Sequence, residues 1–217
     1  MSEKAASRSK EEVVQEYRVH SIQDAAMRVI ARKGMGAATM QEIAKEAGVA
    51  KGTIYLYFRD RDELVEKTFE RAISELHRRV DEALATDARF EEKLRAVLSA
   101  EIRFFQENRE FFRLYLSFRY PEGNPQQQRR QKRTCQPQYQ ARVRRMADSL
   151  RQAMARGEVR DGDPQRLAIF IIEGSNAVII ERVLEDAPPP EESDINLIAQ
   201  AILHGIAVRP TDQRSGM

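Results

Sequence analysis

The stretch TMQEIAKEAGVAKGTIYLYF, from Thr39 to Phe58, restricts this chain to two very short helices in a row. Thr39 and Glu42 form a capping box, in which each side chain can satisfy a free backbone N–H at the start of a helix. Gly48 ends that helix after about two turns, because glycine is a poor helix former and a common helix terminator. Only two residues then connect it to KGTIYLYF, the second short helix.

Longer helices are predicted on both sides of this pair. Upstream, apolar residues between positions 14 and 30 fall close to helical spacing, and two basic residues followed by Gly34 are the expected stop signals. Downstream, Asp60 and Glu63 form a second capping box at the start of DELVEKTFERAISELHRRV. Two short helices joined by a tight turn between longer ones is the layout of a helix-turn-helix DNA reader.

The rest of the chain also favours helices. Ala, Leu, Glu, Arg and Gln recur, whereas Gly and Pro are sparse among the 217 residues, so we expect an all-α fold. An aromatic run, EIRFFQENREFFRLYLSFRYP, ends at Pro121. Residues 124–140 are polar and Gln-rich and are interpreted as a loop that contains Cys135. An amphipathic helix over 139–154 and two apolar segments, 164–185 and 194–208, follow.

The second short helix carries groups suited to nucleic acid. Ile54 and Phe58, four residues apart, can anchor one side of it in the core. Gly52 has no side chain and would let the backbone approach base edges, while Lys51 can reach guanine or a phosphate. Residues 1–74 hold 13 basic and 12 acidic residues, so affinity must come from local placement rather than bulk charge. A helical hairpin with solvent-facing tyrosines is the alternative. Further donors to phosphate are Thr53, Tyr55, Tyr57 and Arg61.

The run from Ile22 to Leu64 resembles the DNA-binding domain of tetracycline-repressor-type (TetR family) transcriptional regulators. The resemblance rests on IxxAA, Gly34, Thr39, IAKEAGV, GTIYxYF and a basic residue beside the capping acids. It implies a recognition helix at about 50 to 57 and a place for Gln41 near the bases.

The resemblance also implies that Thr39, Tyr57 and Arg61 contact phosphates. Many relatives carry Ser at the position of Ala50, which would cap the helix, and Lys at the position of Arg61. The predicted DNA-binding residues are Thr39, Gln41, Ala50, Lys51, Gly52, Thr53, Tyr55, Leu56, Tyr57 and Arg61.

Four segments are therefore expected. Residues 1–11 form a flexible N-terminal arm, and residues 12–66 form a three-helix helix-turn-helix DNA-binding domain. Residues 67–208 form a larger helical domain for effector binding and dimerisation, and residues 209–217 form a disordered tail.

A homodimer is expected because one helix-turn-helix reads a single half-site, and specific binding usually needs two. The segments 164–185 and 194–208 are more apolar than one core requires and contain small residues that allow close packing, so they could form a four-helix interface. The alternative is that both are ordinary core helices of a monomer. The predicted interface residues are Ile169, Ile172, Ile179, Ile180, Val183, Ile198, Ala201, Ile202 and Gly205.

An effector pocket is expected among the aromatic residues, because the resemblance implies central helices that enclose one; a plain core is the alternative. The predicted pocket residues are Phe104, Phe105, Phe111, Phe112, Tyr115, Phe118, Tyr139, Met146, Phe170 and Asn176. Residues 123–147 contain no acid, and their basic residues form either a solvated face or a site for an anionic effector such as an acyl-coenzyme A. These basic residues are Arg129, Arg130, Lys132, Arg133, Arg142, Arg144 and Arg145.

Other classes of protein find less support. His20, His77 and His204 lie far apart, the single cysteine excludes an internal disulfide, and no zinc spacing or phosphate loop occurs. No signal peptide or membrane span is apparent, so we expect a soluble cytoplasmic protein without enzymatic activity, cofactor or metal. The leading hypothesis is a repressor released from a palindromic operator by a small hydrophobic or amphipathic effector. An activator or corepressor-dependent regulator, a non-specific DNA binder and a helical enzyme that keeps only the helix-turn-helix shape stay open.

Overall fold

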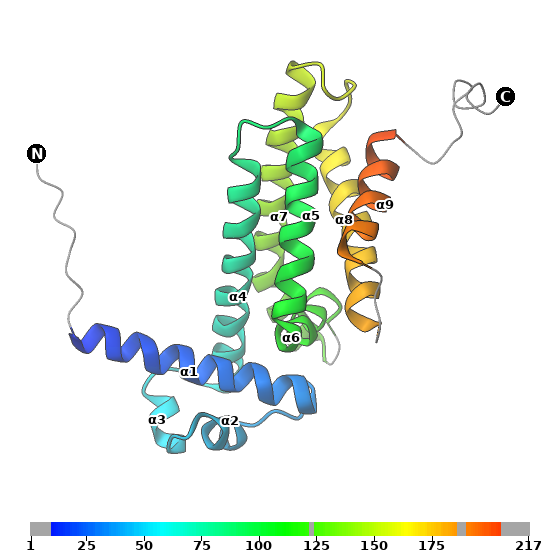
Figure 1. The fold of residues 1–217 in the computed structure, drawn as a ribbon. Helices are drawn as coiled ribbons and strands as arrows, with labels where there is room; N and C mark the ends of the chain where they lie inside the picture. Colours follow the sequence, from blue (N-terminus) through cyan, green and yellow to red (C-terminus); the bar gives the residue numbers. More distant parts are fainter. Residues whose placement is uncertain (1–9, 122–123, 186–189, 205–217) are drawn as a thin grey trace, which may run out of the picture. The chain divides into compact units, whose positions relative to one another are not determined.

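The computed structural model describes residues 10–121, 124–185 and 190–204, and all regular structure in these ranges is helical, which confirms the all-α prediction (Figure 1). Most of the predicted arm, the predicted tail and Gly205 lie outside the described residues. The helices are α1 (Lys10–Lys33), α2 (Met40–Ala47), α3 (Lys51–Tyr55), α4 (Arg61–Leu84), α5 (Phe90–Glu107), α6 (Arg109–Arg119), α7 (Pro125–Ala155), α8 (Pro164–Leu184) and α9 (Glu191–His204).

The helices divide into two compact units that alternate along the chain. The first unit comprises residues up to 74 together with 108–136, and the second comprises 75–107 together with the residues from 137 onward. Helices α4 and α7 therefore contribute residues to both units. This division differs from the predicted boundary after residue 66, because α6 and the start of α7 pack in the same unit as the N-terminal helices.

The first unit is built around α1. This helix buries Ile22, Val29 and Ile30 almost completely and packs against both α2 and α6. Each fully buried Ile contributes about 1.5–3 kcal/mol relative to an exposed one. The Arg113 guanidinium on α6 donates to the carbonyl of Ala31 at 2.5 Å, which places a cation at the negative end of the α1 dipole.

The second unit contains α5, α8, α9, the end of α4 and most of α7. Helix α5 packs against α8 and α9, which also pack against each other. Its core includes buried charges: Arg142 donates to Glu101 at 2.6 Å and to the Asn176 amide oxygen at 3.1 Å. A second buried pair joins Arg182 to Asp194 at 2.5 Å. These pairs matter because a buried charge is tolerated only when it is matched.

One local prediction was wrong. The segment 124–140, interpreted as a loop, is the first half of α7, and Cys135 lies in that helix. Asn124 accepts the Gln127 N–H at 2.9 Å, and Pro125 fits the first helical position because its missing N–H would have had no intrahelical partner. The following Gln and Arg residues are good helix formers. The aromatic run is divided at Asn108, whose φ of −119° and ψ of 53° are not helical.

Candidate nucleic-acid interface

Helix α2 is fixed at both ends by its own caps. The Glu42 N–H donates to the Thr39 hydroxyl oxygen at 3.3 Å, and the Thr39 N–H donates to the Glu42 carboxylate at 3.1 Å, so the predicted capping box is confirmed. Gly48 ends the helix in the left-handed region, with φ 69° and ψ 28°. Because glycine adopts this region without steric cost, the chain can turn at once into α3.

Helix α3 is held by two apolar residues. Ile54 is fully buried and Phe58 is 4% exposed, which confirms the predicted anchoring side. Helix α3 covers only Lys51–Tyr55, shorter than the predicted recognition helix, and Leu56 and Tyr57 lie in the turn that follows. Ala50 makes no side-chain cap hydrogen bond, as its apolar side chain requires.

The opposite side of α3 faces outward. Lys51 and Gly52 are exposed, Tyr55 is 48% exposed and Leu56 is 79% exposed, while Thr53 and Tyr57 are partly exposed. A Cβ atom added at Gly52 would meet no described heavy atom within 4 Å. Internal packing therefore gives no reason for a glycine at this position, although glycine costs the helix about 1 kcal/mol relative to Ala.

The charges around α2 are unequally matched. Glu46 accepts from Arg28 at 2.8 Å and from Arg32 at 2.6 Å, and these hydrogen bonds lower the pKa of Glu46 to about 2. In contrast, Lys45 and Lys51 are exposed and form no ion pair with any residue in the described ranges. The acids of α2 are thus neutralised from α1, whereas two lysines remain available to an anion. Lys45 was not among the predicted DNA-binding residues, although its place in IAKEAG beside the turn was an available signal.

Two predicted phosphate contacts already have protein partners. The Arg61 guanidinium donates from Nε to the Ala38 carbonyl at 2.6 Å and lies 3.4 Å from Asp62. The Thr39 hydroxyl donates to Glu42 at 2.9 Å besides accepting in the capping box. Asp60 accepts the Glu63 N–H at 2.8 Å, but the Glu63 carboxylate accepts from the N–H of the preceding Arg59 instead of closing a box with Asp60. Gln41 is exposed.

The predicted effector residues are mostly core residues. In the first unit, Phe118 stacks on Phe69 with ring centroids 4.1 Å apart and an interplanar angle of 13°. In the second unit, Phe104 and Phe105 meet edge to face at 5.5 Å. Phe111, Phe112, Tyr115, Met146 and Asn176 are buried as well and Tyr139 is partly exposed, whereas Phe170 is 67% exposed on α8.

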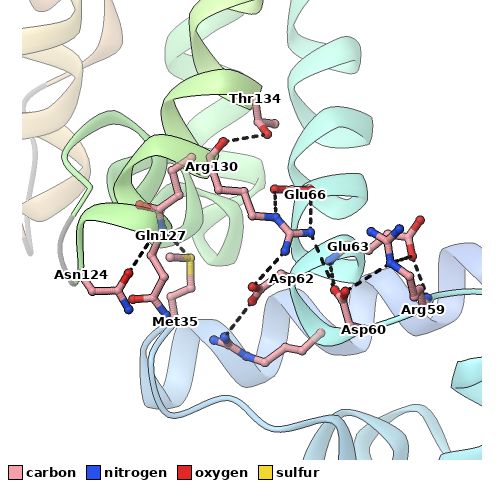
Figure 2. Close-up of polar contacts among 12 residues, drawn as sticks. Met35, Arg59, Asp60, Asp62, Glu63, Glu66, Asn124, Gln127, Arg130 and Thr134 are labelled. Carbon is pink, nitrogen blue, oxygen red and sulfur yellow. Dashed lines mark hydrogen bonds and ion pairs between the residues drawn. The ribbon is translucent and has the colours of Figure 1, made fainter.

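The predicted basic strip does not form one solvated face. Arg130 lies 2.5 Å from Glu66 and 3.1 Å from Asp62 (Figure 2). Arg142 is buried against Glu101, and Arg145 lies 2.7 Å from Asp81. The remaining exposed members are Arg129, Lys132, Arg133 and Arg144.

The predicted interface residues also divide by exposure. Ile172, Ile179 and Ile198 are at most 4% exposed and belong to the core of the second unit. Ile180, Val183 and Ile202 are partly exposed, and Ile169 and Ala201 are exposed. Other exposed residues on the two helices are Phe170, Gly174, Ala177, Leu184 and Leu197.

Other kinds of site find no support in the described part of the chain. There, no group of His, Cys, Asp and Glu side chains could hold a metal ion, and no helix is long and apolar enough to cross a membrane. Burial raises the pKa of the Cys135 thiol, which disfavours a reactive thiolate.

Comparison with known proteins gives a consistent family match. Residues 22–68, which contain every predicted DNA-binding residue, match the family described as bacterial regulatory proteins, tetR family. The fatty acid metabolism regulator protein of Bacillus subtilis is 40% identical over 76 residues, but the match spans only 35% of this chain and 39% of that protein. The uncharacterized HTH-type transcriptional regulator YhgD of the same organism is 23% identical over 86% of this chain and 95% of its own length.

The fold is shared along most of the chain. The crystal structure of FadR from Bacillus subtilis in complex with stearoyl-CoA has a TM-score of 0.73 and 24% identity, covering 87% of this chain and 99% of that one. This similarity supports the arrangement of helices beyond residue 68, where sequence similarity is weak.

Proposed function

Because this chain belongs to the tetR family of helix-turn-helix transcriptional regulators, we propose that it is a repressor that binds a palindromic operator as a homodimer. A small hydrophobic or amphipathic effector releases it. The observation that carries the proposal is the outward side of α3, where Gly52 has no packing role and Lys51 has no partner among the described residues.

In this proposal, α3 enters the major groove of operator DNA. Gly52 brings the backbone close to the base edges, and Lys51 reaches a guanine or a phosphate. Thr53, Tyr55 and Tyr57 donate to phosphate oxygens, with Ala50 and Leu56 in van der Waals contact. Helix α2 supplies Thr39, Gln41 and Lys45 at the edge of the groove. Arg61 acts chiefly as a positioning residue, since it holds the Ala38 carbonyl just before α2.

Substituting Gly52 tests the proposal, because it should move stability and DNA binding in opposite directions. Gly52→Ala should stabilise the protein by about 0.5–1 kcal/mol, since alanine is the better helix former. The same change should weaken operator binding at least about tenfold by holding the backbone off the bases. Thermal unfolding and gel-shift titration on a site selected from random duplexes measure the two effects.

The matched control is Gly36→Ala, which also adds a Cβ in open space but lies outside α2 and α3. It should leave operator affinity unchanged. Unchanged affinity for Gly52→Ala would count against the contact, and selection that yields no preferred sequence would indicate a non-specific DNA binder instead.

The dimer is proposed on the apolar exposed residues of α8 and α9. Phe170, Gly174 and Ala177 follow one another at helical spacing on α8, and Leu197 and Ala201 do so on α9. Two copies related by a two-fold axis would bury this surface and place the two α3 helices about one helical turn of DNA apart, roughly 34 Å. Light scattering after size exclusion should give twice the chain mass; a monomer at micromolar concentration would refute the dimer.

The effector is proposed to be amphipathic, with acyl-coenzyme A as the first class to test. The proposal draws on the FadR neighbour whose structure contains stearoyl-CoA. Release requires that the effector bind the DNA-incompetent arrangement more tightly than the competent one. Titrating stearoyl-CoA into the protein–operator complex should reduce the bound fraction, with free coenzyme A as the control. Increased binding would indicate a corepressor.

A further inference from the structure

The first unit contains a cavity of about 680 Å³, within the range of roughly 300–1,000 Å³ that small-molecule sites occupy. The segment after α1, the first turns of α4, the end of α6 and the first turns of α7 supply its walls. Tyr120, which is 58% exposed, and the exposed Gln127 are among the lining residues, so the cavity reaches the surface. Of the predicted effector residues, only Phe118 lines it.

One part of the wall is apolar. Met35, Val65, Leu116 and Phe118 line the cavity from α4, α6 and the segment after α1. Phe118 is only 2% exposed and is stacked on Phe69, so its ring is fixed in place. This wall would accept the apolar body of a ligand and remove it from water.

The charged side chains that line the cavity are paired with one another. Arg130 lies 2.5 Å from Glu66 and 3.1 Å from Asp62, and Figure 2 shows its guanidinium between the two carboxylates. Arg61 lies 3.4 Å from Asp62. These two cations and two anions leave the lining without net charge. A charged ligand would therefore lose its hydration on entering the cavity without meeting an unpaired counter-ion. An uncharged ligand does not carry this desolvation cost.

Two residues that line the cavity each carry a buried polar atom for which the described part of the chain offers no hydrogen-bond partner. Gln131 is 6% exposed, and no described residue donates to its Oε1, while its Nε2 has only the weak acceptor Met35 Sδ at 3.6 Å. Nη2 of Arg61 is likewise buried without an acceptor in the described ranges. Buried polar groups are normally hydrogen-bonded, so one free acceptor and one free donor in the same cavity indicate a missing partner.

From these features we infer that the cavity is a binding site for an uncharged amphipathic small molecule. Its apolar body contacts the wall around Phe118, and a hydroxyl or primary amide donates to Gln131 and accepts from Arg61. Arg61 also holds the Ala38 carbonyl just before α2. A ligand that engages Arg61 therefore acts two residues before the start of α2. This consequence for DNA binding rests on the proposed function, whereas the binding itself does not.

Titration calorimetry and thermal unfolding of the full chain without DNA test the inference. The probes are decanamide, decanoate and decylammonium, which share one chain and differ in charge. Decanamide should bind saturably, once per chain, and raise Tm, whereas the two ions should bind at least about tenfold more weakly because the lining offers no net charge. No saturable binding of decanamide, or equal binding of decanoate, would overturn the inference.

A variant pair locates the site. Gln131→Leu should weaken decanamide binding about tenfold or more, because the amide then loses its acceptor in a buried place. Gln136→Leu, an exposed position on the same helix outside the cavity, should bind as the wild type does. Wild-type affinity in Gln131→Leu would refute the site. The comparison of head groups needs only the wild-type chain, so it decides the matter even if Gln131→Leu does not fold.

Discussion

The two units of this protein differ in whether they bury ion pairs. Ion pairs of the first unit lie at or near the surface, as where Arg32 of α1 meets Glu46 of α2. The second unit also has surface pairs, such as Arg95 with Glu91, but it buries two others: Glu101 is 1% exposed against Arg142, and Asp194 is 8% exposed against Arg182. Surface pairs stabilise a fold weakly, whereas a buried charge that loses its partner is strongly destabilising. A surface pair of the first unit can therefore lose a charge at little cost in stability, whereas a buried pair of the second unit cannot.

Breaking the buried pair gives the largest expected effect. Glu101→Gln would leave the Arg142 guanidinium buried without its counter-charge, so we expect a loss of about 3–5 kcal/mol of unfolding free energy. Urea denaturation followed by circular dichroism measures it. The double variant Glu101→Leu with Arg142→Met should recover much of the loss, because both buried charges are then gone. A loss below about 1 kcal/mol for Glu101→Gln would remove the contrast between the units.

A pH dependence should follow from His77 in the second unit. Burial, followed by the nearby Arg145 and Arg142, lowers the pKa of His77 from 6.5 to about 4. The unfolded chain therefore binds a proton that the folded chain does not, and stability present above pH 6.5 is lost as the pH falls from 6.5 toward 4. Salt-bridged Glu46 and Glu75 have pKa values of about 2, so their contributions are lost mainly below pH 4.5.

Thermal unfolding between pH 7 and pH 5 isolates this effect. The wild-type Tm should fall over the interval, and that of His77→Leu should fall less. His20→Leu, at a partly exposed position in the first unit, should keep the wild-type profile. Equal slopes for wild type and His77→Leu would show that the buried imidazole is not the source.

The smallest effect is expected for the surface pairs of the first unit. Glu46→Gln removes the partner of Arg28 and Arg32, yet we expect a much smaller loss of unfolding free energy than for Glu101→Gln, because solvent screens pairs at the surface. The same denaturation assay, compared with Glu101→Gln, measures it. A loss as large as that of Glu101→Gln would mean that the first unit also depends on single charges.

The sequence predicted what depends on neighbours along the chain. The capping box of Thr39 and Glu42, the turn at Gly48 and the anchors Ile54 and Phe58 all follow from spacings of three to six residues. Pairs distant in sequence were missed: Glu101 and Arg142 are separated by 41 positions, and no local pattern joins them.

Two further misses have clear physical reasons. The polar composition of residues 124–140 suggested a loop, although Gln and Arg are themselves good helix formers. Helix α8 is apolar on most sides, so periodicity could not tell the buried Ile172 and Ile179 from the exposed Phe170. The cavity beside Gln131 combines segments from residues 34 to 131 and had no local signal.

The turn at Gly48 has a consequence for how a helix-turn-helix such as α2 and α3 could change the DNA sequence that it binds. Only three residues, Gly48 to Ala50, separate α2 from α3, so the connection leaves the two helices little freedom to move independently. The buried anchor Ile54 lies on the same short helix as the outward residues 51, 53 and 55, and the second anchor, Phe58, follows just after the helix. In the proposed function, a single substitution at an outward residue can therefore change which operator sequence is bound while Ile54 and Phe58 keep the segment anchored.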